Sequence, residues 1–234
     1  MTDRAPLRCA YIVSRYPSIT HTFVLREVLA LRERGLDIAP VTVRWSEDIE
    51  LLAPTDRSEA QNTHAILPTT PWQVVRAHAD AFRKAPGGYV RTLAESLWDA
   101  PPGIRAKAWQ FFYFVEGILL WGWLRARGLR HVHAHHANVG ADLAMIATRF
   151  GNRVDSGPRM TWSFTVHGPR ELTDIGTHKL GAKVERADAV VATSDFVRAQ
   201  LMALVDPLHR ARIRMIHVGV MPGNYHSAEQ EPVA

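Results

Sequence analysis

The residue best placed for chemistry is His167, which follows a strand-like stretch and precedes a turn. Apolar and polar residues alternate from Thr161 to Val166, and this period of two predicts a β-strand. Gly168 and Pro169 end the strand, because proline has no amide hydrogen and glycine adopts backbone angles that other residues avoid. His167 therefore stands at the carboxyl end of a strand, where open α/β sheets bind ligands. The alternative is a histidine that only satisfies its own ring nitrogens.

Residues 131–136 contain a cluster of four histidines. On a strand, His131, His133 and His135 would share one face, an arrangement that can bind zinc. A zinc site also needs supporting carboxylates or thiolates, and no cysteine lies nearby in the sequence. We therefore expect no metal here, and we expect one or two of these histidines to line a cleft. Asn138 is placed to cap the following helix.

A polar loop, residues 14–22, follows the first apolar run of the chain. It leads into an amphipathic helix, which Ser18 or Thr20 can cap, so the loop is a natural place for a phosphate or another anion. It lacks the Gly-x-Gly-x-x-Gly pattern, which argues against a dinucleotide site of the usual kind.

Strands and helices alternate along the chain, which predicts an α/β fold: a Rossmann-like, doubly wound, mostly parallel sheet of six or seven strands with helices on both faces. Expected strands are residues 7–13, 36–43, 64–67, 131–135, 161–166, 187–193 and 213–218, and expected helices include 72–97 with a break at Pro86, 104–124, 139–150 ended by Gly151, and 196–204 with Phe196 facing inward. Residues 1–222 would form this domain, and residues 223–234 a linker or disordered tail. Its strand tips would bring residues 14–22, 133–138 and 167–171 to one rim, joined by Ser194.

The composition is that of a globular protein, with 47% hydrophobic and 22% charged residues among 234. The net charge of +5 suits an anionic ligand or membrane surface, and no basic run interleaved with aromatics points to nucleic acid. A single cysteine, Cys9, allows no internal disulfide and predicts a reducing, cytoplasmic setting.

Residues 104–124 form an unusually aromatic segment. A membrane span needs about 20 apolar residues, and this segment is interrupted by Gln110 and Glu116. We favour a helix packed on the sheet, and peripheral contact with the inner face of a membrane stays open.

Several stretches together carry a resemblance to a known family. They are Tyr11–Pro17 with Thr20–Phe23 and Arg26-Glu27, His131–His135, Ser163–Pro169 with Glu171, Arg186–Val191 followed by Ser194–Arg198, and Ile216–Val220. In these stretches the chain resembles the N-terminal half of a family-4 glycosyltransferase, of the branch that assembles bacterial exopolysaccharides of the colanic-acid type.

The resemblance implies one half of a GT-B fold, which moves a sugar from a nucleotide-sugar to a glycan or lipid-linked acceptor with retention of configuration. It implies no metal and no cofactor besides the nucleotide-sugar as co-substrate. His167 would be the catalytic residue beside the donor sugar. Residues expected near the donor phosphate and sugar are Ser14, Arg15, Thr20, His21, Thr22 and Gly168, and those expected in the acceptor cleft are His133, His135, Asn138, Glu171 and Ser194.

The family's second domain carries a pair of glutamates eight residues apart, and this chain has no such pair. We therefore expect the chain to be inactive alone and to need a C-terminal domain or a split-gene partner chain. Two other classes stay open: a non-catalytic module that binds a glycan or lipid-linked glycan, and a metal-dependent hydrolase built on the histidine cluster.

Overall fold

A computed structural model describes residues 7–47 and 53–219 and contains one seven-stranded sheet, in the order β3-β2-β1-β4-β5-β6-β7. Every pairing is parallel, so the predicted α/β fold with a mostly parallel sheet is confirmed. The strands are β1 (Arg8–Arg15), β2 (Asp37–Arg44), β3 (His64–Leu67), β4 (His131–His135), β5 (Thr161–Val166), β6 (Ala189–Ala192) and β7 (Ile213–Met215). The predicted tail, 223–234, lies outside the described residues.

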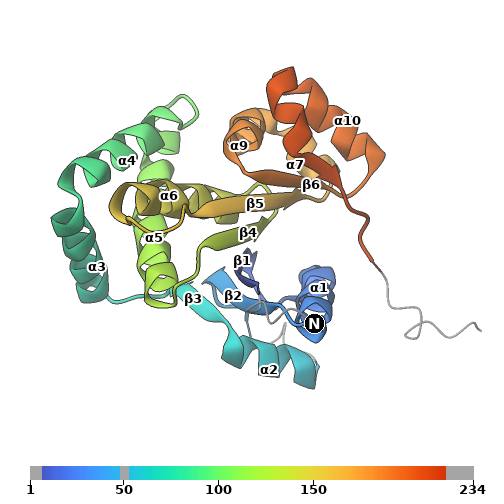
Figure 1. Cartoon of the computed structure of the whole chain (residues 1–234), viewed down its shortest axis with the longest axis horizontal. Helices are drawn as coiled ribbons and strands as arrows, with labels where there is room; N and C mark the ends of the chain where they lie inside the picture. Colours follow the sequence, from blue (N-terminus) through green and yellow to red (C-terminus); the bar gives the residue numbers. More distant parts are fainter. Residues whose placement is uncertain (1–6, 48–52, 220–234) are drawn as a thin grey trace, which may run out of the picture.

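The chain starts in the middle of the sheet, runs to the β3 edge, and then crosses back to place β4 beside β1 (Figure 1). The connections on the two sides of the β1–β4 pair therefore leave in opposite directions. Such a switch point opens a crevice at the carboxyl ends of the strands.

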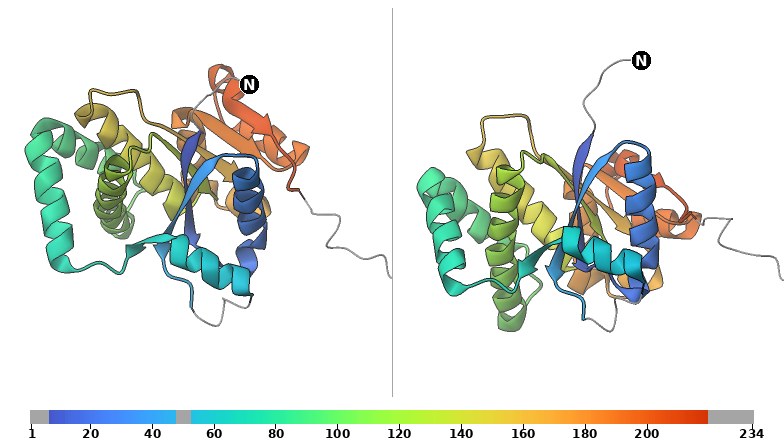
Figure 2. Two further views of the ribbon diagram at one scale, coloured as in Figure 1. Left: turned by 60° about the horizontal axis from the view of Figure 1, so that its bottom comes forward. Right: turned by 90° about the horizontal axis from the view of Figure 1, so that it is seen from below.

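Helices cover the sheet on both faces. Figure 2 shows α1 on one side of β1 and β2, with α5 and α6 on the other. The helices are α1 (Thr22–Glu33), α2 (Pro54–Asn62), α3 (Pro71–Lys84), α4 (Pro86–Trp98), α5 (Ile104–Ala126), α6 (Val139–Val154), α7 (Pro169–Thr173), α8 (Ile175–His178), α9 (Leu180–Arg186) and α10 (Asp195–Ala203), with short 3₁₀ turns at Ile19–His21 and Pro207–Arg212. Within the described part of the chain, no helix is both long and apolar enough to cross a bilayer.

The main core lies between the sheet and the α5–α6 layer. The alternation in β5 turns Phe164 and Val166 into this core, where both are fully buried. Helices α5 and α6 approach closely at Gly117, where an added Cβ would lie 2.6 Å from Ile146 Cγ2. A smaller apolar cluster on the opposite face joins α1 to β1 and includes Val13, among others.

The structure corrects two predictions about helices. Helix α6 runs through Gly151 to Val154, because at Gly151 it passes the Trp121 and Met160 side chains so closely that only glycine fits. Phe196 does not face inward and is 63% exposed, because the buried face of α10 is formed by Val197 and Leu201.

Two predictions about capping and strand length are also corrected. Neither Ser18 nor Thr20 caps α1, because a 3₁₀ turn over Ile19–His21 precedes the helix and makes His21 its N-cap residue. The hydroxyls of Ser18 and Thr20 bond to each other instead. The last strand ends at Met215 instead of residue 218. The caps predicted at Asn138 and Ser194 are confirmed, since both side chains accept backbone N–H bonds.

Candidate functional site

Three strand tips meet at the carboxyl edge of the sheet, as the sequence predicts. The tips of β1 and β4 are joined by a contact of 3.5 Å between Asn138 Nδ2 and Ser14 Oγ. His167 follows β5 directly, and its ring lies against the rings of Phe23 and His136, with centroids 4.6 Å apart in each pair. The site is therefore assembled from segments far apart in sequence and held by the central strands.

Glu171 fastens the tips of β4 and β5 together. Its carboxylate accepts the backbone N–H of Ala137 at 2.5 Å and that of His167 at 2.7 Å. The side chain is almost fully buried, and burial alone would raise its pKa; the His136 ring and these hydrogen bonds outweigh burial and lower it. Buried Lys183 holds the same turn from another side by donating to the Ala137 carbonyl at 2.6 Å. Glu171 thus sets where the His167 ring stands.

The histidines of β4 and the hydroxyls of β5 form a hydrogen-bonded ladder. The register places His131 opposite Thr161 and His133 opposite Ser163 on one face. The two ring nitrogens of His133 bond to Ser163 Oγ at 2.8 Å and to Thr165 Oγ1 at 3.0 Å. Burial and the neighbouring rings lower the pKa of His133 to about 3, so the ring is neutral.

Beyond the ladder, the remaining imidazoles run as a chain of rings toward the surface. His135 Nδ1 lies 3.1 Å from His167 Nε2, so one of these nitrogens donates to the other. Burial and then the His136 ring lower the pKa of His167 to about 4. His136 adopts the left-handed conformation, with φ of 70°, and its ring lies between those of His167 and His21. His167 is therefore a neutral, half-buried imidazole one ring away from His21.

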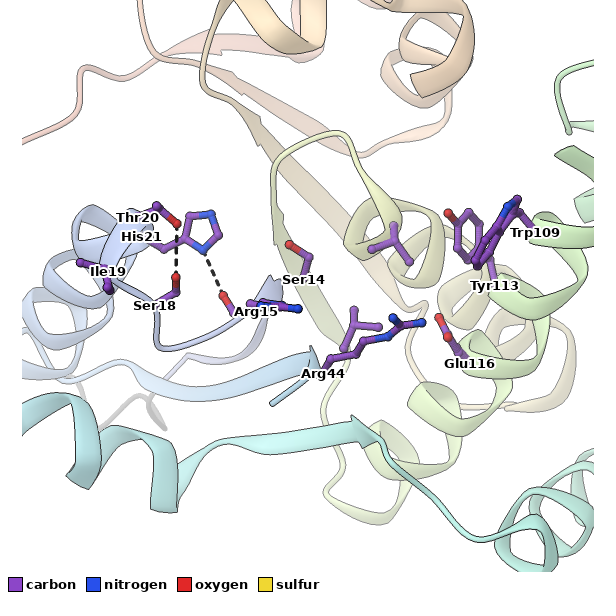
Figure 3. A pocket seen from close by; sticks show the side chains of 12 residues that line it. Ser14, Arg15, Ser18, Ile19, Thr20, His21, Arg44, Trp109, Tyr113 and Glu116 are labelled. Carbon is purple, nitrogen blue, oxygen red and sulfur yellow. Dashed lines mark hydrogen bonds between the residues drawn. The ribbon is translucent and has the colours of Figure 1, made fainter. Parts of the chain in front are cut away.

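His21 stands at the wall of an open cavity of about 590 Å³ (Figure 3). The end of β1 and the loop that follows it, residues 14–21 (called the β1 loop), form one side of the cavity. Within this loop His21 Nδ1 bonds to the Arg15 carbonyl oxygen at 3.0 Å. The opposite side is formed by Trp109 and Tyr113 of α5. The full lining is Ser14, Arg15, Ser18, Ile19, Thr20, His21, Val43, Arg44, Trp109, Tyr113, Glu116 and Val139.

The cavity combines cations, hydroxyls and aromatic rings. Arg44, at the end of β2, points toward Glu116 across it (Figure 3), and burial raises the pKa of Glu116 to about 7 although Arg44 acts against this. Burial therefore favours the protonated form of Glu116. At Val139 the N-terminus of α6 also faces the cavity, and its partial positive charge favours an anion.

The residues predicted for the donor side divide into two groups. Ser14, Arg15, Thr20 and His21 all line the cavity. The remaining two lie elsewhere: Thr22 is exposed at the start of α1, and Gly168 is buried in the turn after β5 with φ of 153°.

The residues predicted for the acceptor side are mostly placed by other contacts. His133 and His135 are buried in the sheet, Glu171 binds backbone amides, and Ser194 caps α10. Asn138 alone of the five lies beside the β1 loop. Sequence reasoning missed Arg44, Trp109, Tyr113 and Glu116; the aromatic run of α5 was visible, but its place beside the β1 loop was not.

One group of side chains has the composition of a metal site. Ligand atoms of Glu27, His133 and His135 lie within 4.8 Å of one another. Both nitrogens of His133 already bond to hydroxyls, however, and Glu27 Oε1 accepts the Tyr11 hydroxyl at 2.9 Å. His135 Nε2, which has no hydrogen-bond partner in the described chain, and the Glu27 carboxylate are two ligands, short of the three that a catalytic zinc needs.

No protein-family model matches this chain, and no curated protein matches it either. The chemistry of the site is therefore inferred from its residues. Hydroxyls, guanidinium groups and a helix N-terminus suit phosphate oxygens, whereas neutral imidazoles and aromatic rings suit a sugar. The cavity itself holds the first set of groups together with the rings of Trp109 and Tyr113, and the neutral imidazole of His167 lies one ring beyond His21.

Proposed function

We propose that this chain is the N-terminal, acceptor-side lobe of a retaining glycosyltransferase of the family-4 type, with the GT-B arrangement. It moves a sugar from a nucleotide-sugar to a glycan or lipid-linked acceptor in bacterial polysaccharide synthesis, in the cytoplasm. The observation that carries the proposal is the cavity at the switch point of the sheet. Four residues expected near the donor line it, and His136 connects it to His167.

The reaction creates negative charge on the departing diphosphate and positive character at the sugar carbon. Arg15, Arg44 and the start of α6 favour the first charge, because two cations and the positive end of a helix dipole lie in the cavity lining. A neutral His167 does not oppose the second charge, and its ring can hydrogen-bond a sugar hydroxyl. We assign His167 a positioning contact with the sugar, and the acceptor proton leaves with the departing phosphate.

A second Rossmann-like lobe completes this proposed enzyme. It faces the carboxyl edge of the sheet and supplies most of the nucleotide site, either from the rest of the same protein or from a partner chain. The chain alone then binds ligand weakly and transfers little or no sugar.

The test combines the purified chain with the Rossmann-like second lobe of the proposed enzyme, either in the same polypeptide or as a separate chain, and measures transfer of labelled sugar from a panel of nucleotide-sugars. We expect His167→Ala to lower the rate about 100-fold or more, the range for losing a group that acts at the transition state. His217→Ala, at an exposed histidine beyond β7, is the matched control and keeps the rate.

Unchanged transfer by His167→Ala, with the fold verified by circular dichroism, would contradict the proposed role. Vigorous transfer by the 234-residue chain alone would contradict the need for a second lobe. Binding of glycans without any transfer by the reconstituted pair would assign the chain to the non-catalytic binding modules instead.

A further inference from the structure

The first three turns of α5 present an apolar face to solvent. Ile104, Phe111 and Phe112 are exposed by 89%, 46% and 55%, and exposed Ala108 lies among them. These four positions follow the spacing i, i+4, i+7 and i+8, so they form one continuous stripe along the helix. Phe111 and Phe112 lie with ring centroids 6.2 Å apart. We call this stripe the α5 outer face.

The same turns already use another stripe for packing. Gln110, Phe114 and Gly117 are buried, with Ala106 and Tyr113 partly so, and they turn toward the protein. The outer face is therefore not needed for the fold, and its large apolar side chains stay in water at a cost of about 25 cal/mol for each Å² of apolar surface. Contiguous exposed apolar surface of this kind marks an interaction site.

Cations border the outer face on both sides. Arg105 and Lys107 are exposed, and neither forms an ion pair within the described chain. Trp109 extends the Arg105 side and contacts Phe112, with ring centroids 6.0 Å apart. Residues 104–115 contain no aspartate or glutamate. The face therefore combines apolar side chains, an aromatic border and a purely positive charge.

We infer that the α5 outer face docks on the surface of an anionic phospholipid bilayer. Helices that lie in a membrane interface have this composition: aromatic and apolar residues that enter the headgroup region, with Lys and Arg at the flanks. The long stems of Arg105 and Lys107 can reach lipid phosphates while the stripe inserts. A protein partner fits less well, because Lys is depleted in protein interfaces.

The position of the face connects it to the cavity. Trp109 borders the outer face and also lines the cavity, together with Tyr113 one turn later. Docking by α5 brings the cavity wall to the membrane surface, which favours the lipid-linked acceptor among the two classes proposed above. That last step rests on the proposed function, whereas the docking itself does not.

The test is flotation of the full chain with vesicles of phosphatidylcholine alone or mixed with phosphatidylglycerol. We expect the chain to float with the mixed vesicles and to be released by salt, because the charge term is screened. The double variant Phe111→Ser/Phe112→Ser should lose binding, whereas Phe196→Ser keeps it. Phe196 is the matched control because it is 63% exposed on α10.

A second pair of variants tests the charge. Each Lys or Arg near an anionic surface contributes about 1 kcal/mol, so Arg105→Gln/Lys107→Gln should weaken binding roughly 30-fold. Arg198→Gln, at an exposed arginine of α10, is the control. None of the substituted residues lines the cavity, but Phe112 contacts the lining residue Trp109. Sugar transfer in solution by the Arg105→Gln/Lys107→Gln variant therefore measures the proposed function separately.

Three outcomes would overturn the inference: wild-type chain that stays unbound with mixed vesicles, equal loss in the Phe196→Ser control, or binding that ignores lipid charge. Sedimentation that shows a dimer broken by Phe111→Ser/Phe112→Ser would assign the face to a second copy of the chain instead. Thermal melting of each variant verifies that the fold is intact.

Discussion

Replacing Glu171 by alanine tests the clamp that joins the tips of β4 and β5. The change leaves the buried amides of Ala137 and His167 without their acceptor, since both bond to this carboxylate at 2.5 and 2.7 Å. A hydrogen bond to a charged group contributes about 1.5–3 kcal/mol, so the loss of two predicts about 3–6 kcal/mol of destabilisation. Glu171→Gln keeps the volume but offers one amide a carbonyl and the other an NH₂ group, so about half of that loss should remain.

Urea unfolding at pH 8, followed by circular dichroism, measures both variants against Glu33→Ala. Glu33 is exposed in the last turn of α1, and its removal should stay within about 0.5 kcal/mol of the wild type. Acidification adds a second readout, because the pKa of Glu171 lies below its usual value in the folded chain. Its contribution is present above the unfolded pKa and disappears as pH falls through the lower folded pKa, so the gap between wild type and Glu171→Gln should close in acid. A loss below about 1 kcal/mol for Glu171→Ala would refute the clamp.

Three further predictions concern the core and the histidines. In the folded chain the pKa of His133 is lowered to about 3 and that of His167 to about 4, so the unfolded chain binds protons more readily below pH 6.5. The free energy of unfolding should therefore fall as the pH drops below 6.5, by up to about 2 kcal/mol for each histidine at pH 5. Urea midpoints that do not change with pH would contradict this. Gly117→Ala should lower the free energy of unfolding by about 1–3 kcal/mol, because the added Cβ would collide with Ile146. Gly122→Ala, whose Cβ would meet no atom within 4 Å, should raise the free energy of unfolding by about 0.5–1 kcal/mol. Thermal melting measures both changes. Chain equilibrated with zinc and then desalted should hold well under one ion per molecule by elemental analysis; a full equivalent would show that His133 gives up its hydroxyl partners.

The strands and their tips were predictable because their signals are local. Alternation marks β5, Gly168 and Pro169 end it, and the predicted strand at residues 64–67 coincides with β3. Since parallel strands end at one edge, the meeting of the β1 loop with His167 followed from chain order alone. A helix cap depends on a side chain and an amide two or three residues apart, which is why Asn138 and Ser194 were placed correctly.

The far wall of the cavity was not predictable because it depends on a long crossover. Between β3 and β4 the chain forms α3, α4 and α5, and no local pattern says which turn of α5 returns beside the β1 loop. The histidine ladder has the same limit. The sequence predicts which face of the strand His133 lies on. Only the pairing of β4 with β5 places its ring between the hydroxyls of Ser163 and Thr165, which bond to both ring nitrogens.

The two apolar clusters differ in size, and this difference has a consequence for how the cavity behaves. The α1 side rests on seven buried side chains, whereas the α5–α6 side belongs to a far larger core. Partial unfolding costs least where the least apolar surface is sealed, so amide protons of α1 should exchange with deuterium before those of α6. A ligand that enters the cavity therefore contacts a rigid wall on the α5 side and a more easily opened wall on the α1 side. The α1 side bears His21 and can adjust its shape to the ligand.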